Sequence, residues 1–219
     1  MTKNLYLARH GQTLFNLHHK TQGWSDSPLT ELGVKLAKKT GQHFKENGVH
    51  FDLGYSSTSG RANRTLELMT DEELKYERLP ELREQNYGVY EAQDSYLRPH
   101  DVTEVTDAYY ERQGVEKPDH VQNRIVHCIK KIMDEAPEGS NVLIVGHGFS
   151  SFTFDVWAAG LGIASPREIK DELMYQKIRD LFIPNAGYVK IEYNDGNFKV
   201  LESYNPATDE TRDLRNFLS

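Results

Sequence analysis

The sequence predicts an α/β fold, a three-layer α/β/α sandwich in which a mostly parallel sheet lies between two layers of helices. Two observations carry this prediction. Short apolar runs alternate three times with stretches of helical periodicity, as expected where crossover helices join parallel strands. The length of 219 residues also suffices for one domain with a sizeable core, and we expect a single domain over residues 1–219.

The first strand and helix open the chain. The first apolar run ends abruptly at Arg9, His10 and Gly11, as expected for a buried strand with polar residues at its carboxyl end. Ligands bind at this edge of open α/β sheets, and an arginine beside an imidazole suits a phosphate. The next helix is predicted to begin near Thr30 and to end near residues 47–48.

Two further units repeat the pattern. Residues 51–57 form the second predicted strand, and a helix runs from Ser59 to about Met69. Residues 141–145 form the third strand, followed by a helix over residues 149–159. Parallel strands end at one edge of their sheet, so we expect the residues after all three strands to lie close together.

An excursion interrupts this alternation. Residues 88–114 are polar and rich in aromatic side chains, and they contain no convincing strand, so they are predicted to form a cap-like insertion over the edge of the sheet. An amphipathic helix then begins at Pro118 and is closed by Pro137 and Gly139.

The C-terminal part is predicted to be a charged helix followed by strands. The helix covers residues 165–180, and the strands cover residues 179–183, 187–193 and 198–203. Asn194-Asp195-Gly196 joins the last two strands and is a strong hairpin signal. The polar tail from Asn205 is expected to be poorly ordered.

Composition excludes several classes of function. A net charge of -7, from 26 basic and 33 acidic residues, does not favour nucleic acid or an anionic membrane as a partner. The single cysteine, Cys128, excludes an intrachain disulfide and a multi-cysteine metal site, and is expected to serve packing. The amino terminus shows no leader pattern and no stretch is apolar enough to span a membrane, so a cytoplasmic location is expected.

Candidate catalytic and phosphate-binding residues follow the ends of the predicted strands. A neutral imidazole such as His10 is a competent nucleophile toward phosphorus. Arg9 and Arg61 could hold phosphoryl oxygens bidentately and keep their charge at any working pH. His147, after the third strand, could complete this set of donors. For any one of these residues alone, a structural role is the alternative.

The motifs together resemble the histidine phosphatase superfamily, in the branch with an Arg-His-Gly motif that includes cofactor-dependent phosphoglycerate mutases. The matching segments are Arg9-His10-Gly11-Gln12-Thr13 with Asn16, Gln22-Gly23, Asp26-Ser27-Pro28-Leu29-Thr30 with Gly33, Tyr55-Ser56-Ser57 with Arg61-Ala62, Leu82 to Gly88, and Gly146-His147-Gly148. The resemblance implies a phosphoglycerate mutase-like fold. The chain departs from the family pattern at Ala92, where glycine is usual, and at Gly146, where serine is common.

The resemblance also implies roles at the site. His10 would be the nucleophile, Arg9, Arg61 and His147 the phosphoryl ligands, and Glu84 the general acid. Glu77, Glu81 and Glu91 compete for the acid role, and Glu84 is preferred because the family places its acid four residues before this glycine, Gly88. Further substrate contacts are expected from Gly11, Asn16, Gln22, Gly23 and Gly148. Asn185-Ala186-Gly187 resembles a late family motif but reads equally as a turn.

The expected function is hydrolysis of a small phosphomonoester through a phosphohistidine, without a metal or other cofactor. Phosphoglycerate mutases of the family usually carry a longer insertion with paired arginines, whereas residues 88–114 hold only Arg98 and Arg112. A cofactor-dependent phosphoglycerate mutase is the first alternative, and a non-catalytic phosphate-binding protein is the second. The oligomeric state stays open, with a homodimer as one alternative.

Overall fold

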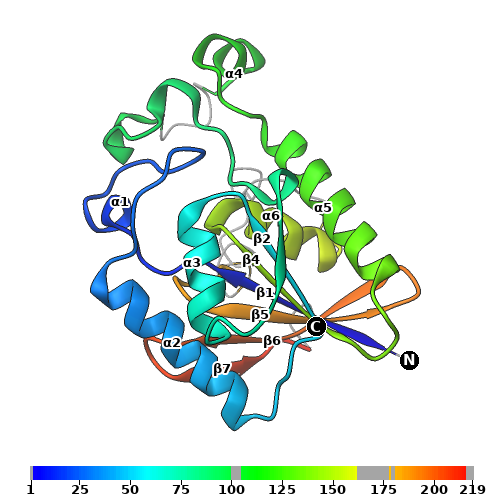
Figure 1. Ribbon diagram of the computed structural model, residues 1–219. Helices are drawn as coiled ribbons and strands as arrows, with labels where there is room; N and C mark the ends of the chain where they lie inside the picture. Colours follow the sequence, from blue (N-terminus) through cyan, green and yellow to red (C-terminus); the bar gives the residue numbers. More distant parts are fainter. Residues whose placement is uncertain (1, 100–104, 162–177, 179–180, 216–219) are drawn as a thin grey trace.

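The apolar runs become the central strands of one seven-stranded sheet, in the order β3-β2-β4-β1-β5-β6-β7 (Figure 1). The computed structural model describes residues 2–99, 105–161, 178 and 181–215. The strands are β1 (Lys3–Arg9), β2 (Leu53–Ser57), β3 (Tyr76–Leu79), β4 (Asn141–Gly146), β5 (Tyr188–Asn194), β6 (Asn197–Asn205) and β7 (Glu210–Asp213). The helices of the described residues are α1 (Leu14–Leu17), α2 (Glu31–Glu46), α3 (Gly60–Met69), α4 (Asp107–Gln113), α5 (Pro118–Glu135) and α6 (Gly148–Ala158).

The sheet is mixed. Strands β3, β2, β4 and β1 are parallel, and β5, β6 and β7 are each antiparallel to the strand before them in the sheet. Because β5 is antiparallel to β1, it begins at the edge where β1 and β4 end. The segment that leads into β5 therefore reaches the same edge as His10 and His147.

Helices cover both faces of the sheet, as predicted. Tyr6 and Ala8 of β1 pack on the side of α2, where they meet Phe44. The alternate residues Leu5 and Leu7 belong to the core on the opposite face, which is covered by α5 and α6 (Figure 1). Since β1 is buried on both faces, it needs an uninterrupted apolar run rather than an alternating one.

Most of the predicted elements are confirmed. Thr30 caps α2 by accepting a hydrogen bond from the Gly33 amide at 3.0 Å, and the predicted helices after residues 59, 117 and 147 are α3, α5 and α6. The C-terminal hairpin is also present. Its two-residue turn is Asp195-Gly196, and both residues have the positive φ that this turn requires, 46° and 82°.

The strand predicted at residues 179–183 is wrong in the part that the structure describes. Leu181 and Ile183 are buried and Phe182 between them is exposed, which is the alternation that indicated a strand. The backbone nevertheless turns here, because the Leu181 amide donates to the Ile178 carbonyl. The helix predicted for residues 165–180 lies outside the described residues except at Ile178.

Two edge strands were not predicted. β3 pairs in parallel with β2, and β7 pairs with β6 in the tail that was expected to be poorly ordered, so that expectation is wrong for residues 210–213. All four residues of β7 are exposed, as are the two central residues of β3. Such strands carry no buried face, and therefore no apolar pattern marks them.

The excursion at residues 88–114 contains no strand in its described part, as predicted. It holds two 3₁₀ helices, η2 (Gly88–Tyr90) and η3 (Ser95–Leu97), and then α4, which lies far from the sheet in Figure 1. Isolated bridges tie it down, from Lys20 to Asp94 and from Tyr87 to Val115. The excursion is thus joined to the loop that follows α1.

Candidate active site

Adjacent parallel strands bring two histidines together. Arg9, the last residue of β1, pairs with Gly146, the last residue of β4, so the residues that follow must be neighbours. These residues are His10 and His147, and their ring centroids are 5.3 Å apart. Both side chains are buried. The structure therefore places two imidazoles at the carboxyl edge of the sheet.

The His10 ring is held in one orientation. Its Nδ1 lies 2.8 Å from the Gly11 carbonyl oxygen, which can only accept, so Nδ1 carries the hydrogen and the lone pair lies on Nε2. Burial, followed by the positive charges of Arg61 and Arg9, lowers the pKa of His10 well below its usual 6.5. His10 is therefore a neutral imidazole with a free lone pair at pH 7.

His147 has the opposite tautomer. Arg61 Nη2 lies 3.0 Å from His147 Nδ1, and since a guanidinium only donates, this nitrogen accepts. The His147 Nε2 hydrogen is then donated to Ser57 Oγ at 2.7 Å. Burial and the nearby Arg61 lower the pKa of His147 well below 6.5. His147 was expected to donate a hydrogen bond to the phosphoryl group, but in this arrangement its Nε2 hydrogen is directed at Ser57 Oγ.

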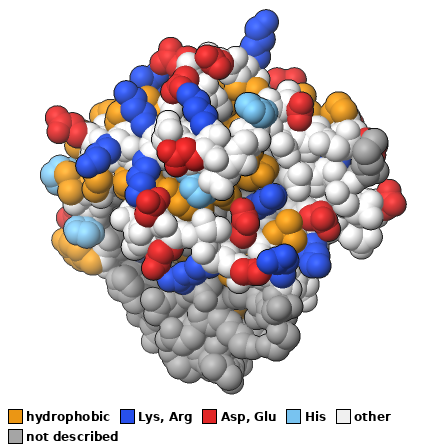
Figure 2. All heavy atoms as spheres, turned by 90° about the horizontal axis from the view of Figure 1, so that it is seen from below, with side chains coloured by type: hydrophobic (Ala, Val, Ile, Leu, Met, Phe, Trp, Pro, Cys, Tyr) orange, Lys and Arg blue, Asp and Glu red, His pale blue; other side chains and the backbone are white. Residues whose placement is uncertain are grey.

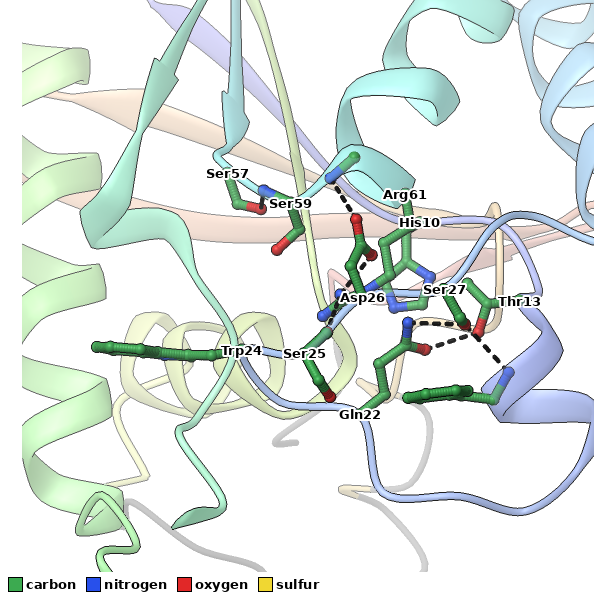
Figure 3. Close-up of polar contacts among 12 residues, drawn as sticks. His10, Thr13, Gln22, Trp24, Ser25, Asp26, Ser27, Ser57, Ser59 and Arg61 are labelled. Carbon is green, nitrogen blue, oxygen red and sulfur yellow. Dashed lines mark hydrogen bonds and ion pairs between the residues drawn. The ribbon is translucent and has the colours of Figure 1, made fainter. Parts of the chain in front are cut away.

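Both terminal nitrogens of Arg61 are held by the protein. Nη1 donates to the Ser25 carbonyl and to Asp26 Oδ1, each at 2.9 Å. Nη2 donates to the Gly23 carbonyl at 2.8 Å as well as to His147. Figure 3 shows Ser25 and Asp26, on the loop from Gln22 to Ser27, beside Arg61 and His10. The buried Nε has no partner in the described part of the chain, so this donor is left for a ligand.

Arg9 is bound more loosely. Its Nη1 donates to the Ile183 carbonyl at 3.1 Å, and its guanidinium lies over the Phe182 ring, 5.4 Å from the centroid. The buried Nε again has no partner among the residues described. A Cβ at position 148 would lie 3.2 Å from this Nε, so the glycine at Gly148 leaves room for the arginine.

Glu84 lies at the amino-terminal end of α6. Its Oε2 accepts from the Phe149 amide at 2.9 Å, and its Oε1 accepts from the amides of Ser150 at 2.8 Å and Gln85 at 2.9 Å. Three backbone donors and the positive end of the helix dipole stabilise the carboxylate. Since α6 begins directly after His147, this contact also fixes Glu84 relative to the two histidines.

Two asparagines lie at the rim. Asn185 donates to the His10 carbonyl at 3.1 Å and to Asn16 Oδ1 at 3.3 Å. The same Asn16 oxygen accepts from the Thr13 amide at 3.2 Å. The structure thus places the late motif around Asn185 at the edge of the sheet beside His10, across the start of β5.

Gln22 and Gly11 have structural contacts of their own. Gln22 accepts from Thr13 Oγ1 at 2.6 Å and donates to Ser27 Oγ at 3.1 Å, so its amide braces the loop (Figure 3). A Cβ at Gly11 would lie 2.8 Å from the Gly33 carbonyl oxygen. The close approach that Gly11 permits is therefore to the start of α2.

Sequence reasoning gave no role to Arg124, which holds the loop around Glu84. Nη1 donates to the carbonyls of Glu81 and Arg83 at 2.7 Å, and Nη2 donates to the Glu84 carbonyl at 2.9 Å. The guanidinium also pairs with both oxygens of Glu116, at 2.7 and 2.8 Å. No periodic pattern marks Arg124, because three of its acceptors are backbone carbonyls, which any residue type supplies.

Ser57 and Asp26 were also assigned no role. Both stood within the segments that matched the family pattern, and that match was the available signal. Asp26 Oδ2 accepts from the Gly60 amide at 2.7 Å, so this carboxylate bridges the start of α3 to Arg61. Ser57 ends β2 and accepts from His147.

The arrangement suits a small anion with tetrahedral oxygens. Arg61 is buried and Arg9 is half-buried, each has a buried Nε without a partner in the described part of the chain, and the neutral imidazole of His10 lies near them. Buried donors without partners are rare in folded proteins, and here they gather at one edge of the sheet. Arginine is the residue best matched to phosphate oxygens.

Comparison with known proteins identifies the family. The model of the histidine phosphatase superfamily (branch 1) matches residues 5–206. The chain belongs to this superfamily. Solved structures that share the fold seen here are named both as mutases and as phosphatases.

Two relatives of known name illustrate the range of similarity. A probable phosphoglycerate mutase GpmB of Yersinia pestis (strain Pestoides F) is 32% identical over 157 residues, which cover 67% of this chain and 70% of that protein. A 2,3-bisphosphoglycerate-dependent phosphoglycerate mutase of Methylocella silvestris is 41% identical over 92 residues, or 40% of this chain and 45% of that protein. The match therefore spans less than half of the Methylocella mutase.

A solved structure supports the fold. The phosphoglycerate mutase from Bacillus anthracis str. Sterne superposes with a TM-score of 0.71 at 31% identity, and 91% of each chain is covered. The phosphoglycerate mutase-like α/β fold predicted from the sequence is thereby confirmed.

Two surface properties bear on partners. On the face shown in Figure 2, basic and acidic side chains are interspersed over the described part, and no extended basic area is seen there. No helix among the described residues is long and apolar enough to cross a bilayer.

Proposed function

We propose that this histidine phosphatase family member hydrolyses a small phosphomonoester through a phosphohistidine at His10, without a metal ion. The observation that carries the proposal is the neutral His10, whose Nε2 carries the lone pair, beside Nε donors of Arg9 and Arg61 that lack partners among the residues the structure describes. Phosphoryl transfer is catalysed mainly by such positioning and by charge stabilisation.

The reaction proceeds in two transfers. His10 Nε2 attacks phosphorus, the ester P–O bond breaks, and the leaving oxygen takes a proton from Glu84. Water then attacks the phosphohistidine, the P–N bond breaks, and Glu84 takes back a proton from the water. Arg9 and Arg61 hold the phosphoryl oxygens through both steps.

Glu84 must bind a proton before the first transfer. In the described arrangement both of its oxygens accept backbone hydrogens, so the acid role requires one oxygen to give up an amide contact.

His147 has a supporting role in this scheme. Its ring accepts from Arg61 and donates to Ser57, and it thereby holds the arginine beside His10. A donor role toward phosphate would require its Nε2 hydrogen to turn from Ser57 to the substrate.

Hydrolysis is preferred over mutase activity because of the excursion. Residues 88–114 hold two arginines, Arg98 and Arg112, and no lysine, so they lack the paired cations with which a bisphosphate could be retained. The names of the similar Yersinia and Methylocella proteins favour the second candidate, a cofactor-dependent phosphoglycerate mutase.

Trapping the phosphoenzyme tests the proposal. The protein is incubated with ³²P-labelled phenyl phosphate and quenched in alkali, and acid-labile label is mapped by peptide analysis. We expect label at His10 that is absent from His10→Ala, whereas the exposed His120 serves as control, with His120→Ala labelling normally. Absence of label on the wild-type protein at every pH tried would support the non-catalytic alternative.

Product analysis separates the two enzymatic candidates. With 3-phosphoglycerate and a trace of 2,3-bisphosphoglycerate, a phosphatase releases inorganic phosphate. Rapid formation of 2-phosphoglycerate without release of phosphate would instead establish the mutase.

A further inference from the structure

Ala186, next to the rim residue Asn185, has an unusual backbone conformation. Its φ is 61°, in the left-handed region that a side chain disfavours, and its exposed fraction is 0%. Among the described non-glycine residues with a positive φ, it alone is buried. Alanine also has no polar side chain that could stabilise this conformation by a local hydrogen bond.

The left-handed residue lies in a tight turn that leads into β5. The Gly187 amide donates to the Pro184 carbonyl at 2.9 Å, so Ala186 is the third of the four turn residues. Turns with a positive φ at this position prefer glycine or asparagine. The alanine therefore makes the turn strained, and contacts from elsewhere in the molecule must hold it in place.

This turn contacts the backbone of the proposed nucleophile. The Ala186 amide lies 3.1 Å from the Arg9 carbonyl oxygen and 3.2 Å from the His10 carbonyl oxygen, and it donates to both. The Asn185 side chain donates to the same His10 carbonyl at 3.1 Å and to Asn16 Oδ1 at 3.3 Å. The His10 carbonyl thus receives two hydrogen bonds from the turn.

Thr40 of α2 anchors the carbonyl of the strained residue. Its Oγ1 donates to the Ala186 carbonyl at 2.7 Å, although 146 positions separate the two residues, and Thr40 is also 0% exposed. Ala186 packs in the core on the side of the sheet that α2 covers (Figure 1). A buried carbonyl that loses its donor is left unsatisfied, so without this hydroxyl the turn would shift toward another partner.

We propose that Thr40 is a positioning residue for the nucleophile, because its hydroxyl keeps the strained turn against the His10 carbonyl. The inference rests on the proposed function. Thr40 acts through the backbone of Ala186, whereas the arginines of the site hold the phosphoryl group. Loss of the Thr40 hydroxyl should therefore slow phosphoryl transfer more than it weakens substrate binding.

Substitutions at position 40 test the proposal. Thr40→Val keeps the shape of the side chain and removes the hydroxyl, whereas Thr40→Ser keeps the hydroxyl. Phosphorylation of His10 by p-nitrophenyl phosphate is measured by quenched flow. We expect its rate at saturation to fall about tenfold in Thr40→Val, because small misplacements of a reacting group slow transfer, with little change in the half-saturating substrate concentration. Thr40→Ser should restore most of the rate.

A substitution at position 186 tests the part played by strain. Glycine adopts a positive φ at no steric cost, so in Ala186→Gly the turn should depend less on Thr40. We therefore expect Thr40→Val to lower the phosphorylation rate less in the Ala186→Gly background than in the wild-type background. Equal losses in the two backgrounds would overturn the role of the strained turn.

A second threonine provides the control. Thr70 Oγ1 also donates to a backbone carbonyl, that of Leu66 at 3.0 Å, but at the carboxyl end of α3. Thr70→Val should leave the phosphorylation rate unchanged. Urea unfolding of each variant shows which remain folded. Thr40→Cys, whose thiol is a weak donor, replaces Thr40→Val if the latter does not fold.

The outcomes separate the two proposals. An unchanged phosphorylation rate in folded Thr40→Val, with the wild-type protein still forming phosphohistidine, overturns the role of Thr40 alone. The same rate with a lower free energy of unfolding would make Thr40 a packing residue. A wild-type protein that forms no phosphohistidine overturns the proposed function, and the role of Thr40 falls with it.

Discussion

His10 is neutral because of what surrounds it. The imidazole is buried at the end of β1, and two arginine charges oppose its protonation, so its pKa lies well below 6.5. A nucleophilic imidazole needs its lone pair, which protonation removes. Under the proposed function, the same cations that would attract a phosphoryl group therefore keep the lone pair of His10 Nε2 available for attack.

The lowered pKa of His10 predicts how the rate of its phosphorylation falls at acidic pH. Because the pKa of His10 is lowered, the neutral form persists as the pH falls through 6.5 and is lost only at lower pH. Phosphorylation from p-nitrophenyl phosphate, measured by quenched flow from pH 8 to 4.5, should follow this course. Arg9→Met removes one of the opposing charges and should move the acid limb to higher pH. A wild-type rate already half lost above pH 6.5 would contradict the assignment.

Two neighbouring serines of β2 allow a test of the His147 tautomer. Ser57 accepts the His147 hydrogen, whereas the buried Ser56 hydroxyl has no partner among the described residues. Ser57→Ala leaves a buried N–H unpaired and should lower the free energy of unfolding by about 1–3 kcal/mol, measured in urea. Ser56→Ala, which removes an unsatisfied hydroxyl, should cost much less. Equal losses would mean that the hydrogen bond to Ser57 adds nothing.

At the scale of residues, sequence reasoning located the groups but not their contacts. His10 and His147 could be placed together because each directly follows a recognisable buried strand. It could not be foreseen that both Arg61 terminal nitrogens are engaged by the loop at Gly23 and Asp26. Those contacts depend on how a loop without periodicity folds back on α3.

Among the elements, the loop that carries Glu84 depends on a residue of α5. Arg124 donates to three carbonyl oxygens of this loop, those of Glu81, Arg83 and Glu84, and Glu116 orients the guanidinium. A backbone held in this way can keep the Glu84 carboxyl in position at the amino terminus of α6. An error of about 1 Å in such placement can cost a hundredfold in rate.

Loss of Arg124 should therefore affect poor leaving groups most. In Arg124→Met we expect kcat to fall about tenfold or more with glycerol 3-phosphate, and less with p-nitrophenyl phosphate, whose leaving oxygen needs little help from an acid. Arg64→Met is the control, because Arg64 also contacts two carboxylates, Glu67 and Glu72, but at an exposed site. An equal loss on both substrates would show that Arg124 acts on stability only.

The elements that sequence reasoning found are those with a buried face. α2, α5, β1 and β4 carry strong apolar patterns and were placed to within a few residues. β3 and β7 pair through their backbones at opposite edges of the sheet, and their side chains are largely exposed. Their formation depends on the neighbouring strand, which a local pattern does not report.

For the molecule as a whole, a ligand at this site should stabilise the fold. The candidate site takes side chains from β1, α3 and the start of α6, and so joins both helical layers to the sheet. Phosphate at about 100 times its dissociation constant should add ~2.7 kcal/mol, or roughly 5–10 °C in Tm. Differential scanning fluorimetry checks this against potassium chloride of equal ionic strength. Arg9→Met should show a much smaller shift, and an identical shift in that variant would place the anion elsewhere.

The antiparallel entry of β5 has a consequence for biosynthesis. Asn185 donates a hydrogen bond to the His10 carbonyl, although 175 positions separate the two residues along the chain. His10 therefore leaves the ribosome 175 positions before its neighbour at the rim. A nascent chain can therefore form the first strand, loop and helix early, but it cannot possess a finished pocket until the C-terminal hairpin has been made and has docked.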